Sequence, residues 1–288
     1  MTVAEALRAA ADRLSAASDT ARLDAELLMA HTLGCSRTDL LLRHMAAGAP
    51  SGFCALVERR MGHEPVAYIT GSTDFYGLEL AVSPAVLIPR GDTETLVEAA
   101  REAFEQRQPP RRILDMGTGS GALLLAALSL WPQADGVAIE RSAQALAVAR
   151  GNAARLAPSA RMLEGDWTKA GWADDLGTFD LVLSNPPYVE DDASLDLSVR
   201  AHEPASALFS GPDGLDDYRI LVPQLPGLLA RDGVAIVEIG WQQAAVVCAL
   251  AEASGMTFRV HRDLAGRERA VEMAKMANIP LGKGPAGH

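Results

Sequence analysis

Over roughly the first seventy residues, apolar and polar positions alternate with the period of an α-helix. Thr2 and Glu5 have the spacing of a capping box, which indicates a helix start. A second helix is predicted over DAELLMAHTLG, with Leu27, Ala30 and the preceding Leu23 on its apolar face and Gly34 as its stop. Because no alternating strand pattern occurs in this part, the sequence predicts a small helical bundle.

The period of the pattern changes at Phe75. In GLELAVSPAVLIP the alternation begins at Leu78, a turn is predicted near Ser83 and Pro84, and a second strand is predicted over 86–88. This pattern is typical of a β-hairpin, and we expect it to join two domains.

After the next predicted helix, DTETLVEAAREAF, short apolar runs follow one another: RRILDMG, GVAIE, ARMLEG, FDLVLSN, GVAIVEIG, FRVHRD and RAVEMA. The first five alternate with helical stretches such as SGALLLAALSLW, which is typical of a parallel sheet covered by helices on both faces. The predicted fold class is therefore α/β. The expected division is a helical domain over 1–72, a β-hairpin linker over 73–88, an α/β domain over 89–277 and a disordered, Gly- and Pro-rich tail over 278–288.

A glycine-rich turn joins the first of these strands to a helix. Glycines there allow backbone N–H groups to approach a bound ligand without a side-chain clash. The candidate cofactor-binding residues of this turn are Asp115, Gly117, Thr118, Gly119, Ser120 and Gly121. With Ala122 in the last position, the turn also fits a dinucleotide-binding fingerprint, so by itself it leaves two classes of cofactor open.

Three further residues follow predicted strands and can contact an adenosine group. Glu140 ends the second strand, where its carboxylate can accept hydrogen bonds from two ribose hydroxyls. Asp166 and Trp167 follow the third strand. The Asp166 carboxylate can accept from an adenine amino group or cap a helix, and the indole of Trp167 can cover the ring face.

The fourth strand runs into Asn185, Pro186, Pro187 and Tyr188, where open parallel sheets bind their ligands. An amide nitrogen is a poor nucleophile because its lone pair is delocalised. The Asn185 side-chain oxygen and the Pro186 carbonyl can fix a planar NH₂ group and favour the charge that develops as a methyl group arrives. Tyr188 can stack on the same group. The Asn-Pro-Pro-Tyr run resembles the substrate loop of enzymes that methylate planar nitrogens, and this resemblance implies methylation of either an adenine amine or a side-chain amide.

Composition narrows the possible partners. A net charge of −11, with three lysines in 288 residues, argues against a protein whose main task is binding nucleic acid. The cysteines and histidines are dispersed, so no metal site is expected. No apolar run reaches the roughly 18 residues that span a bilayer, and the first residues lack a signal-peptide pattern. We expect a cytoplasmic monomer.

The motif order adds a family resemblance. The matching stretches are DAELLMAHTLG, HEPVAYITGSTDFYG, LIPRGDTETLVE, DMGTGSG, GDW, SNPPYV, HEPASALFSGPDGL, VEIGWQQ and RDLAGRERAV. Over nearly its whole length the chain resembles the release-factor glutamine methyltransferases, a family of class I S-adenosylmethionine-dependent enzymes. The resemblance implies a Rossmann-like seven-stranded domain behind the helical bundle. It also implies methyl transfer to N5 of the glutamine in the Gly-Gly-Gln loop of peptide chain release factors, which modulates translation termination.

Carried over by motif, residues 117–121, Glu140 and Trp167 would hold S-adenosylmethionine, and 185–188 would hold the glutamine, with Asn185 also close to the cofactor. The helical domain would help to dock the release factor. Three positions depart from the family pattern: Gly91 stands in place of proline, Glu140 in place of aspartate and His202 in place of tyrosine.

Three other functions remain to be compared with this one. An adenine-N6 methyltransferase would share both loops but should carry a basic target-recognition region. A hydride-transferring dehydrogenase could use Gly117 and Glu140, but it leaves residues 185–188 without a purpose. A non-catalytic adaptor that binds the release factor or ribosome would not need Asn185 and an intact glycine loop.

Overall fold

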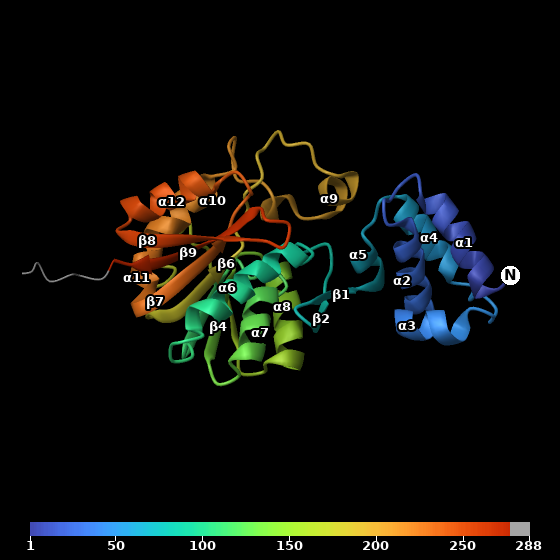
Figure 1. Ribbon diagram of the computed structural model, residues 1–288, viewed down its shortest axis with the longest axis horizontal. Helices are drawn as coiled ribbons and strands as arrows, with labels where there is room; N and C mark the ends of the chain where they lie inside the picture. Colours follow the sequence, from blue (N-terminus) through green and yellow to red (C-terminus); the bar gives the residue numbers. More distant parts are fainter. Residues whose placement is uncertain (277–288) are drawn as a thin grey trace, which may run out of the picture. The chain divides into compact units, whose positions relative to one another are not determined.

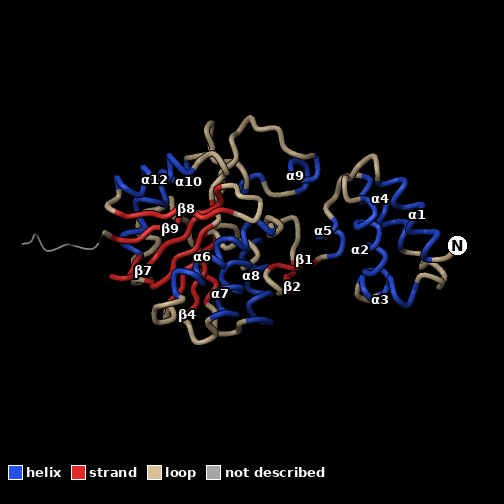
Figure 2. The backbone as a smooth tube through the Cα atoms, in the orientation of Figure 1, coloured by secondary structure: helices blue, strands red, loops and turns tan. Residues whose placement is uncertain are grey.

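The computed structural model describes residues 1–276, and the tail predicted to be disordered over 278–288 lies outside the described residues. The chain forms two compact units (Figures 1 and 2). Unit 1 comprises Met1–Ile88 together with Ala193–Ala207, and unit 2 comprises Pro89–Asp192 together with residues 208–276.

Unit 1 begins as the sequence predicts. The capping box is confirmed: the Thr2 N–H donates to Glu5 Oε2 at 2.8 Å, and the Glu5 N–H donates to Thr2 Oγ1 at 3.2 Å. Gly34 ends the second helix with a φ of 64°, a left-handed value that suits glycine. The helical elements of the N-terminal part are α1 (Val3–Leu14), α2 (Ala21–Leu33), α3 (Arg37–Asp39), the π-helical η1 (Leu40–His44), α4 (Phe53–Met61) and α5 (Val66–Thr70).

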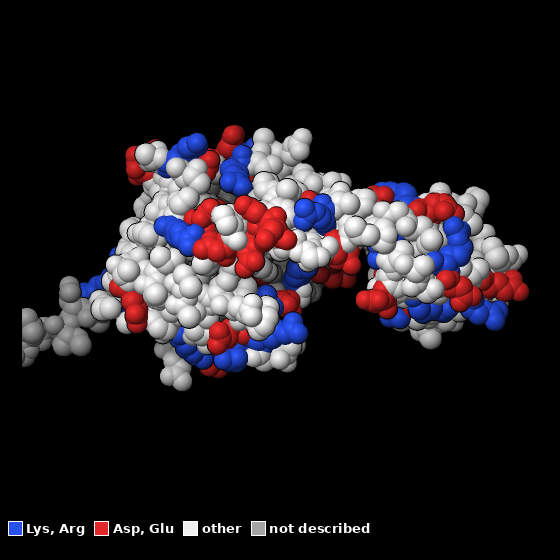
Figure 3. Space-filling view, turned by 90° about the horizontal axis from the view of Figure 1, so that it is seen from above, with Lys and Arg blue, Asp and Glu red and all other residues white. Residues whose placement is uncertain are grey.

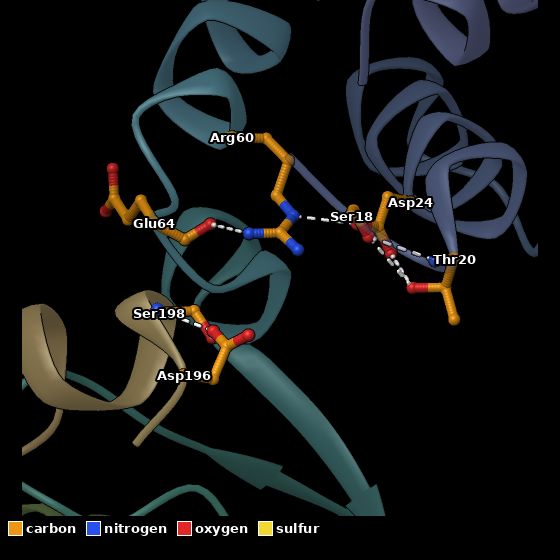
Figure 4. Close-up of polar contacts among 7 residues, drawn as sticks. All are labelled: Ser18, Thr20, Asp24, Arg60, Glu64, Asp196 and Ser198. Atoms are coloured by element: carbon orange, nitrogen blue, oxygen red, sulfur yellow. Dashed lines mark hydrogen bonds and ion pairs between the residues drawn. The ribbon is translucent and has the colours of Figure 1, made fainter. Parts of the chain in front are cut away.

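The predicted apolar face of α2 is wrong at two of its three residues, since Ala30 alone of the three is buried in the core. Leu23 and Leu27 are 40% and 37% exposed, whereas Leu28 and Met29 are fully buried in the core of unit 1. The helix is turned in this way because Asp24 lies inside, where its carboxylate accepts hydrogen bonds from Ser18, Thr20 and Arg60 (Figure 4). A buried charge is tolerated when it is paired and hydrogen-bonded, so polar contacts override the leucine pattern here.

A β-hairpin follows α5, but its turn is not where the sequence predicts it. Strand β1 (Ser72–Phe75) pairs with β2 (Leu78–Ala81) in antiparallel fashion, and the turn is Tyr76–Gly77 with φ values of 50° and 74°. Positive φ at both central residues is typical of a type I′ turn, whose twist matches that of the strands. A turn does form near Ser83 and Pro84, where the Val86 N–H donates to the Ser83 carbonyl at 3.1 Å, but 86–88 forms no strand, so this is not the turn of the hairpin. Because proline cannot adopt a positive φ, Pro84 could not occupy a central position of a type I′ turn.

The segment 193–207 belongs to unit 1, although the sequence analysis placed it in the α/β domain. It contains α9 (Leu197–His202) and the 3₁₀ turn η3 (Ala205–Ala207). The Glu203 carboxylate accepts a hydrogen bond from the Ile88 N–H at 3.2 Å, and His202 Nε2 lies 3.2 Å from the Gly62 carbonyl oxygen. These contacts join residues more than a hundred positions apart, which sequence periodicity does not encode.

Unit 2 is built on a seven-stranded sheet with the order β5-β4-β3-β6-β7-β9-β8. The first five strands in this order are parallel, and β9 pairs in antiparallel fashion with both β7 and β8. All seven predicted strands are confirmed. Their bounds are β3 (Arg112–Met116), β4 (Asp135–Glu140), β5 (Arg161–Glu164), β6 (Phe179–Ser184), β7 (Leu229–Glu238), β8 (Met256–Arg262) and β9 (Glu268–Lys275).

Helices cover the sheet in two groups (Figure 2). One group packs α6 against α7 and α7 against α8, and the other packs α10 and the η4 turn against α12. The elements are η2 (Gly91–Thr93), α6 (Glu94–Phe104), α7 (Ala122–Leu130), α8 (Ala143–Leu156), α10 (Asp216–Leu221), η4 (Val222–Gln224), α11 (Leu225–Leu228) and α12 (Ala244–Ala253). The central parallel strands β3, β4 and β6 are buried on both faces, which explains their nearly continuous apolar runs.

Gly91, which departs from the family pattern, is exposed and opens the η2 turn that leads into α6. A Cβ atom added there would meet nothing within 4 Å, so the position does not require glycine.

Candidate active site

Two predicted functional loops leave neighbouring strands at the same edge of the sheet. Strands β3 and β6 are paired in parallel with Met116 opposite Ser184, so Gly117 and Asn185 begin the two loops side by side. The Ser184 hydroxyl donates to the Met116 carbonyl at 2.8 Å and ties the two strand ends together. The strand order reverses between β3 and β6, and this switch point is where open parallel sheets bind ligands.

The glycine loop lies against the indole of Trp167. Gly117, Gly119 and Gly121 have φ values of 73°, 56° and 89°, all in the left-handed region. A Cβ atom on Gly117 would lie 2.8 Å from the Trp167 ring, so a larger residue does not fit. Thr118 and Ser120 are buried in the loop. The loop thus presents backbone rather than side chains at the end of β3.

Asp115 supports this loop from within β3. Its carboxylate is buried, and Oδ2 accepts from Thr118 Oγ1 at 2.5 Å and from the Leu124 N–H at 3.3 Å. Oδ1 makes no hydrogen bond among the residues that the structure describes. Burial raises the pKa of Asp115 to about 7, and the nearby Glu140 adds to this rise. Asp115 therefore shapes the turn through Thr118 and the start of α7.

Glu140 points at the same loop from the end of β4. Its Oε2 accepts from the Gly119 N–H at 2.9 Å, and its Oε1 accepts from the Ser142 N–H at 2.8 Å. Each carboxylate oxygen retains a second lone pair that can accept a hydroxyl of a bound ribose.

Asp166 and Trp167 follow β5, as predicted, but their environments differ. Asp166 is engaged locally: Oδ1 accepts from the Thr168 hydroxyl at 2.7 Å and from the Thr168 N–H at 2.9 Å, and these contacts lower the pKa of Asp166. Trp167 is packed in the core of unit 2, and its Nε1 donates to Asp217 Oδ1 at 3.3 Å. The Asp166 hydrogen bonds close a turn and do not cap a helix, because residues 167–178 form no helix.

The loop after β6 begins with Asn185, whose Nδ2 donates to Thr93 Oγ1 at 3.4 Å. This contact leaves the Asn185 side-chain oxygen available as an acceptor. Pro186 and Pro187 are buried, and within residues 1–276 the Pro186 carbonyl accepts no hydrogen bond. Two acceptor oxygens therefore belong to consecutive residues of one rigid turn.

Tyr188 ends this loop with its hydroxyl donated to Glu238 Oε1 at 3.1 Å. Burial raises the pKa of Tyr188 well above its usual range, with the Glu238 charge adding to the rise, so the hydroxyl stays protonated. Glu238 itself is buried at the end of β7, and burial raises its pKa to about 7.

Sequence reasoning assigned no role to four residues around these loops: Thr93, Asp217, Glu238 and Gln243. One of them had a signal. Glu238 is a carboxylate inside the apolar run GVAIVEIG, and an acidic residue in a strand buried on both faces requires a polar partner.

Comparison with known proteins identifies two families, whose matches divide the chain close to residue 88, although the second match includes residues 193–207 of unit 1. The PrmC N-terminal domain family matches residues 5–71, and the Methyltransferase small domain family matches residues 92–207. The chain is 40% identical to the release factor glutamine methyltransferase of Caulobacter vibrioides, over 94% of this chain and 96% of the relative. It is 43% identical to that of Bordetella pertussis, over 86% of this chain and 93% of the relative.

The chain belongs to the release factor glutamine methyltransferase family. The similarity extends over both units, because the Caulobacter relative is matched over nearly its whole length. The seven-stranded sheet of unit 2 is accordingly a class I methyltransferase fold, and the resemblance drawn from the sequence motifs is confirmed.

Proposed function

We propose that the protein transfers the methyl group of S-adenosyl-L-methionine to N5 of the glutamine in the Gly-Gly-Gln loop of peptide chain release factors. S-adenosyl-L-homocysteine is the second product. Family membership supports this reaction. The structural observation that carries it is the pairing of β3 with β6, which brings the glycine loop and Asn185 to one edge of the sheet.

The residues at the ends of β3, β4 and β5 fit the cofactor. A cradle of left-handed glycines exposes backbone at residues 117–121, and the Glu140 carboxylate can accept from ribose hydroxyls. When bound, S-adenosyl-L-methionine supplies an electrophilic methyl group on a sulfonium sulfur. The proposed cofactor-binding residues are Asp115, Gly117, Thr118, Gly119, Ser120, Gly121, Glu140, Asp166, Trp167 and Asn185.

The glutamine side chain would be held by the loop after β6. The Asn185 side-chain oxygen and the Pro186 carbonyl accept its two N–H groups, which aligns the nitrogen and favours the positive charge that forms on it. Pro187 keeps the turn rigid, and the Tyr188 ring packs on the planar amide. The C–S bond breaks as the C–N bond forms, and the acidic N-methylated cation then loses its proton to water, so no strong base is required.

The family assignment also bears on partners. We infer that unit 1 contributes to release-factor docking, that the protein acts as a monomer and that it works in the cytoplasm, where translation termination takes place. Within residues 1–276, no helix combines the length and the apolar character needed to cross a membrane.

Adenine-N6 methylation of nucleic acid is less well supported. On the face shown in Figure 3, Lys and Arg side chains lie in small groups interleaved with Asp and Glu. Neutralising a phosphate backbone requires clustered positive charge, and the net charge of the chain is −11.

The test is methyl transfer from labelled S-adenosyl-L-methionine to a purified release factor. A factor whose Gly-Gly-Gln loop carries glutamate in place of glutamine, and duplex DNA, serve as parallel substrates. Label on the unmodified factor alone is the expected result. Label on DNA would favour the adenine reaction, and an absence of label on every substrate would contradict the proposal.

A further inference from the structure

Both the side-chain hydroxyl and the backbone carbonyl of Tyr188 are hydrogen-bonded to one short segment that is distant in sequence. Its hydroxyl donates to Glu238 Oε1 at 3.1 Å, and its backbone carbonyl accepts from Gln243 Nε2 at 3.0 Å. Glu238 is the last residue of β7, and Gln243 precedes the first residue of α12. The segment from the end of β7 to the start of α12 thus fixes the last residue of the Asn-Pro-Pro-Tyr loop by two hydrogen bonds.

The hydrogen bonds of Gln243 define how its amide is oriented. Oε1 accepts from the Gly240 N–H at 3.0 Å, while Nε2 donates to the carbonyls of Tyr188 and Gly214, at 3.0 Å and 3.2 Å. A primary amide supplies one acceptor and two N–H donors, which matches these three partners. The reverse orientation would place the amide oxygen against two carbonyl oxygens. Gln243 therefore joins three separate backbone segments.

The backbone around this contact is packed closely. A Cβ atom on Gly214 would collide with the Tyr188 carbonyl oxygen, and one on Gly240 would lie 2.8 Å from Gln243 Oε1. Gly214 has a φ of 67°, which a residue with a side chain adopts only with strain. Both glycines permit the approach that the Gln243 hydrogen bonds require.

The other end of the loop is also anchored. Ser184, which immediately precedes Asn185, donates to the Met116 carbonyl at 2.8 Å. Between this anchor and Tyr188 lie two prolines, whose rings restrict φ to about −65°. Because the spacer is rigid, a displacement of Tyr188 is transmitted to Asn185 and to the Pro186 carbonyl.

We propose that Glu238 and Gln243 are positioning residues for methyl transfer: by fixing the hydroxyl and the carbonyl of Tyr188, they hold the two acceptor oxygens of the loop in place for the incoming amide. This inference rests on the proposed function. A misplacement of about 1 Å at a reacting centre can cost about 10²-fold in rate, so small shifts of the loop are sufficient to matter. The Tyr188 hydroxyl is committed to Glu238, which leaves the ring face for the substrate.

The central test is Gln243→Glu, which preserves the size of the side chain and the acceptor for Gly240 but turns an oxygen toward the carbonyls of Tyr188 and Gly214. The matched control is Gln242→Glu, the same change at the exposed neighbouring residue. We expect kcat to fall by about 10-fold or more in Gln243→Glu, as for a misplaced reacting group. KM for S-adenosyl-L-methionine should stay within about 2-fold of the control, because the glycine loop is not touched. Equal kcat values in the two variants would overturn the role of Gln243.

The Glu238 contact is tested by a double-mutant cycle with Tyr188→Phe and Glu238→Leu, because glutamine at 238 would keep an acceptor oxygen for the Tyr188 hydroxyl. Phenylalanine keeps the ring face and removes only the hydroxyl. If the two residues act through one hydrogen bond, the double variant should lose less kcat than the product of the two single losses. Multiplicative losses would show that Glu238 acts elsewhere.

A readout that does not depend on methyl transfer separates the two proposals. The Tyr188 and Val189 N–H groups both donate to the Leu208 carbonyl, so their hydrogen exchange reports whether the loop stays closed. Faster exchange at these amides in Gln243→Glu, but not in Gln242→Glu, is expected even if the natural acceptor is not a release factor. Unchanged exchange would overturn the proposal that Gln243 positions Tyr188. Failure of wild-type methyl transfer to a release factor would overturn only the proposed function.

Discussion

A Cβ atom placed on Gly117 would lie 2.8 Å from Cη2 of Trp167, so the indole ring and the glycine loop are in direct contact. The two residues follow β3 and β5, strands that are separated in the sheet by β4. One wall of the proposed cofactor site is therefore built by tertiary packing of a tryptophan against backbone.

This contact predicts that Gly117→Ala destabilises the protein more than Gly119→Ala. Both glycines have positive φ, so both variants carry the cost of a left-handed alanine, roughly 1–2 kcal/mol. A Cβ on Gly119 meets no atom within 4 Å, whereas one on Gly117 strikes the ring, and overpacking costs a further 1–3 kcal/mol or so. Urea unfolding followed by tryptophan fluorescence measures the difference. Equal free energies of unfolding would contradict the contact.

Asn185→Ala should lower kcat by about 10² or more, because one of the two acceptors for the substrate amide is lost. Folding should be intact, since Asn185 is only partly buried and its one hydrogen bond, to Thr93, is long. Labelled methyl transfer and circular dichroism provide the two measurements.

Asn152→Ala is the contrasting variant for Asn185. Asn152 is fully buried, and its Nδ2 donates to the Ser120 carbonyl at 2.9 Å, so its loss should appear as reduced stability. Near-normal turnover in Asn185→Ala would contradict the amide-holding role.

Asp115 predicts a pH dependence of stability. Burial raises its pKa to about 7, whereas the pKa of an aspartate in an unfolded chain is about 3.9. Between these pH values the folded state binds the extra proton, so the contribution of this group is complete at low pH and is lost as the pH rises through about 7. Asp115→Asn cannot ionise. The free energy of unfolding of the variant minus that of wild type should therefore increase from about pH 4 to about pH 7 and then level off.

Urea unfolding of both proteins at a series of pH values measures this difference. The raised pKa of Glu238 affects both proteins equally and cancels in the comparison. A difference that does not change with pH would show that the Asp115 carboxyl is ionised in the folded protein throughout.

The buried ion pair in unit 1 predicts a large effect of one arginine and a small effect of its neighbour. Arg60 Nε donates to Asp24 Oδ2 at 2.7 Å, and both side chains are about 90% buried (Figure 4). Arg60→Met leaves the Asp24 carboxylate buried without its counter-charge, and breaking such a pair costs about 3 kcal/mol or more. Arg59 pairs with Glu64 but is 45% exposed, so Arg59→Met should cost less than about 1 kcal/mol.

Hydrogen exchange of the α2 amides measures the free energy of opening for these two variants in the intact protein. Similar values in Arg59→Met and Arg60→Met would contradict the importance of the buried pair.

The local pattern of apolar and polar residues was sufficient to predict the strands and helices whose burial depends on that pattern. The central strands β3, β4 and β6 could be predicted because a parallel strand buried on both faces must be a short apolar run. Helices were predicted where a start and a stop signal bound the apolar pattern. The two loops were recognised because glycines and prolines limit the backbone. The position of the hairpin turn was not predicted because Tyr76 adopts a positive φ that tyrosine seldom shows. The buried face of α2 was not fully predicted because Asp24, a charged residue, is buried.

The sequence by itself determined the order of elements, the family and the two loops that carry the proposed chemistry. Only the tertiary structure decided which residues support those loops. Gln243 is 55 positions from Tyr188, and their hydrogen bond exists because the ends of β6 and β7 meet at one edge of the sheet. Thr93, in the η2 turn, is 92 positions from Asn185 and reaches it only in the folded chain. Periodicity reports which face of an element is buried, whereas the partner of a buried polar atom depends on where the chain returns in space.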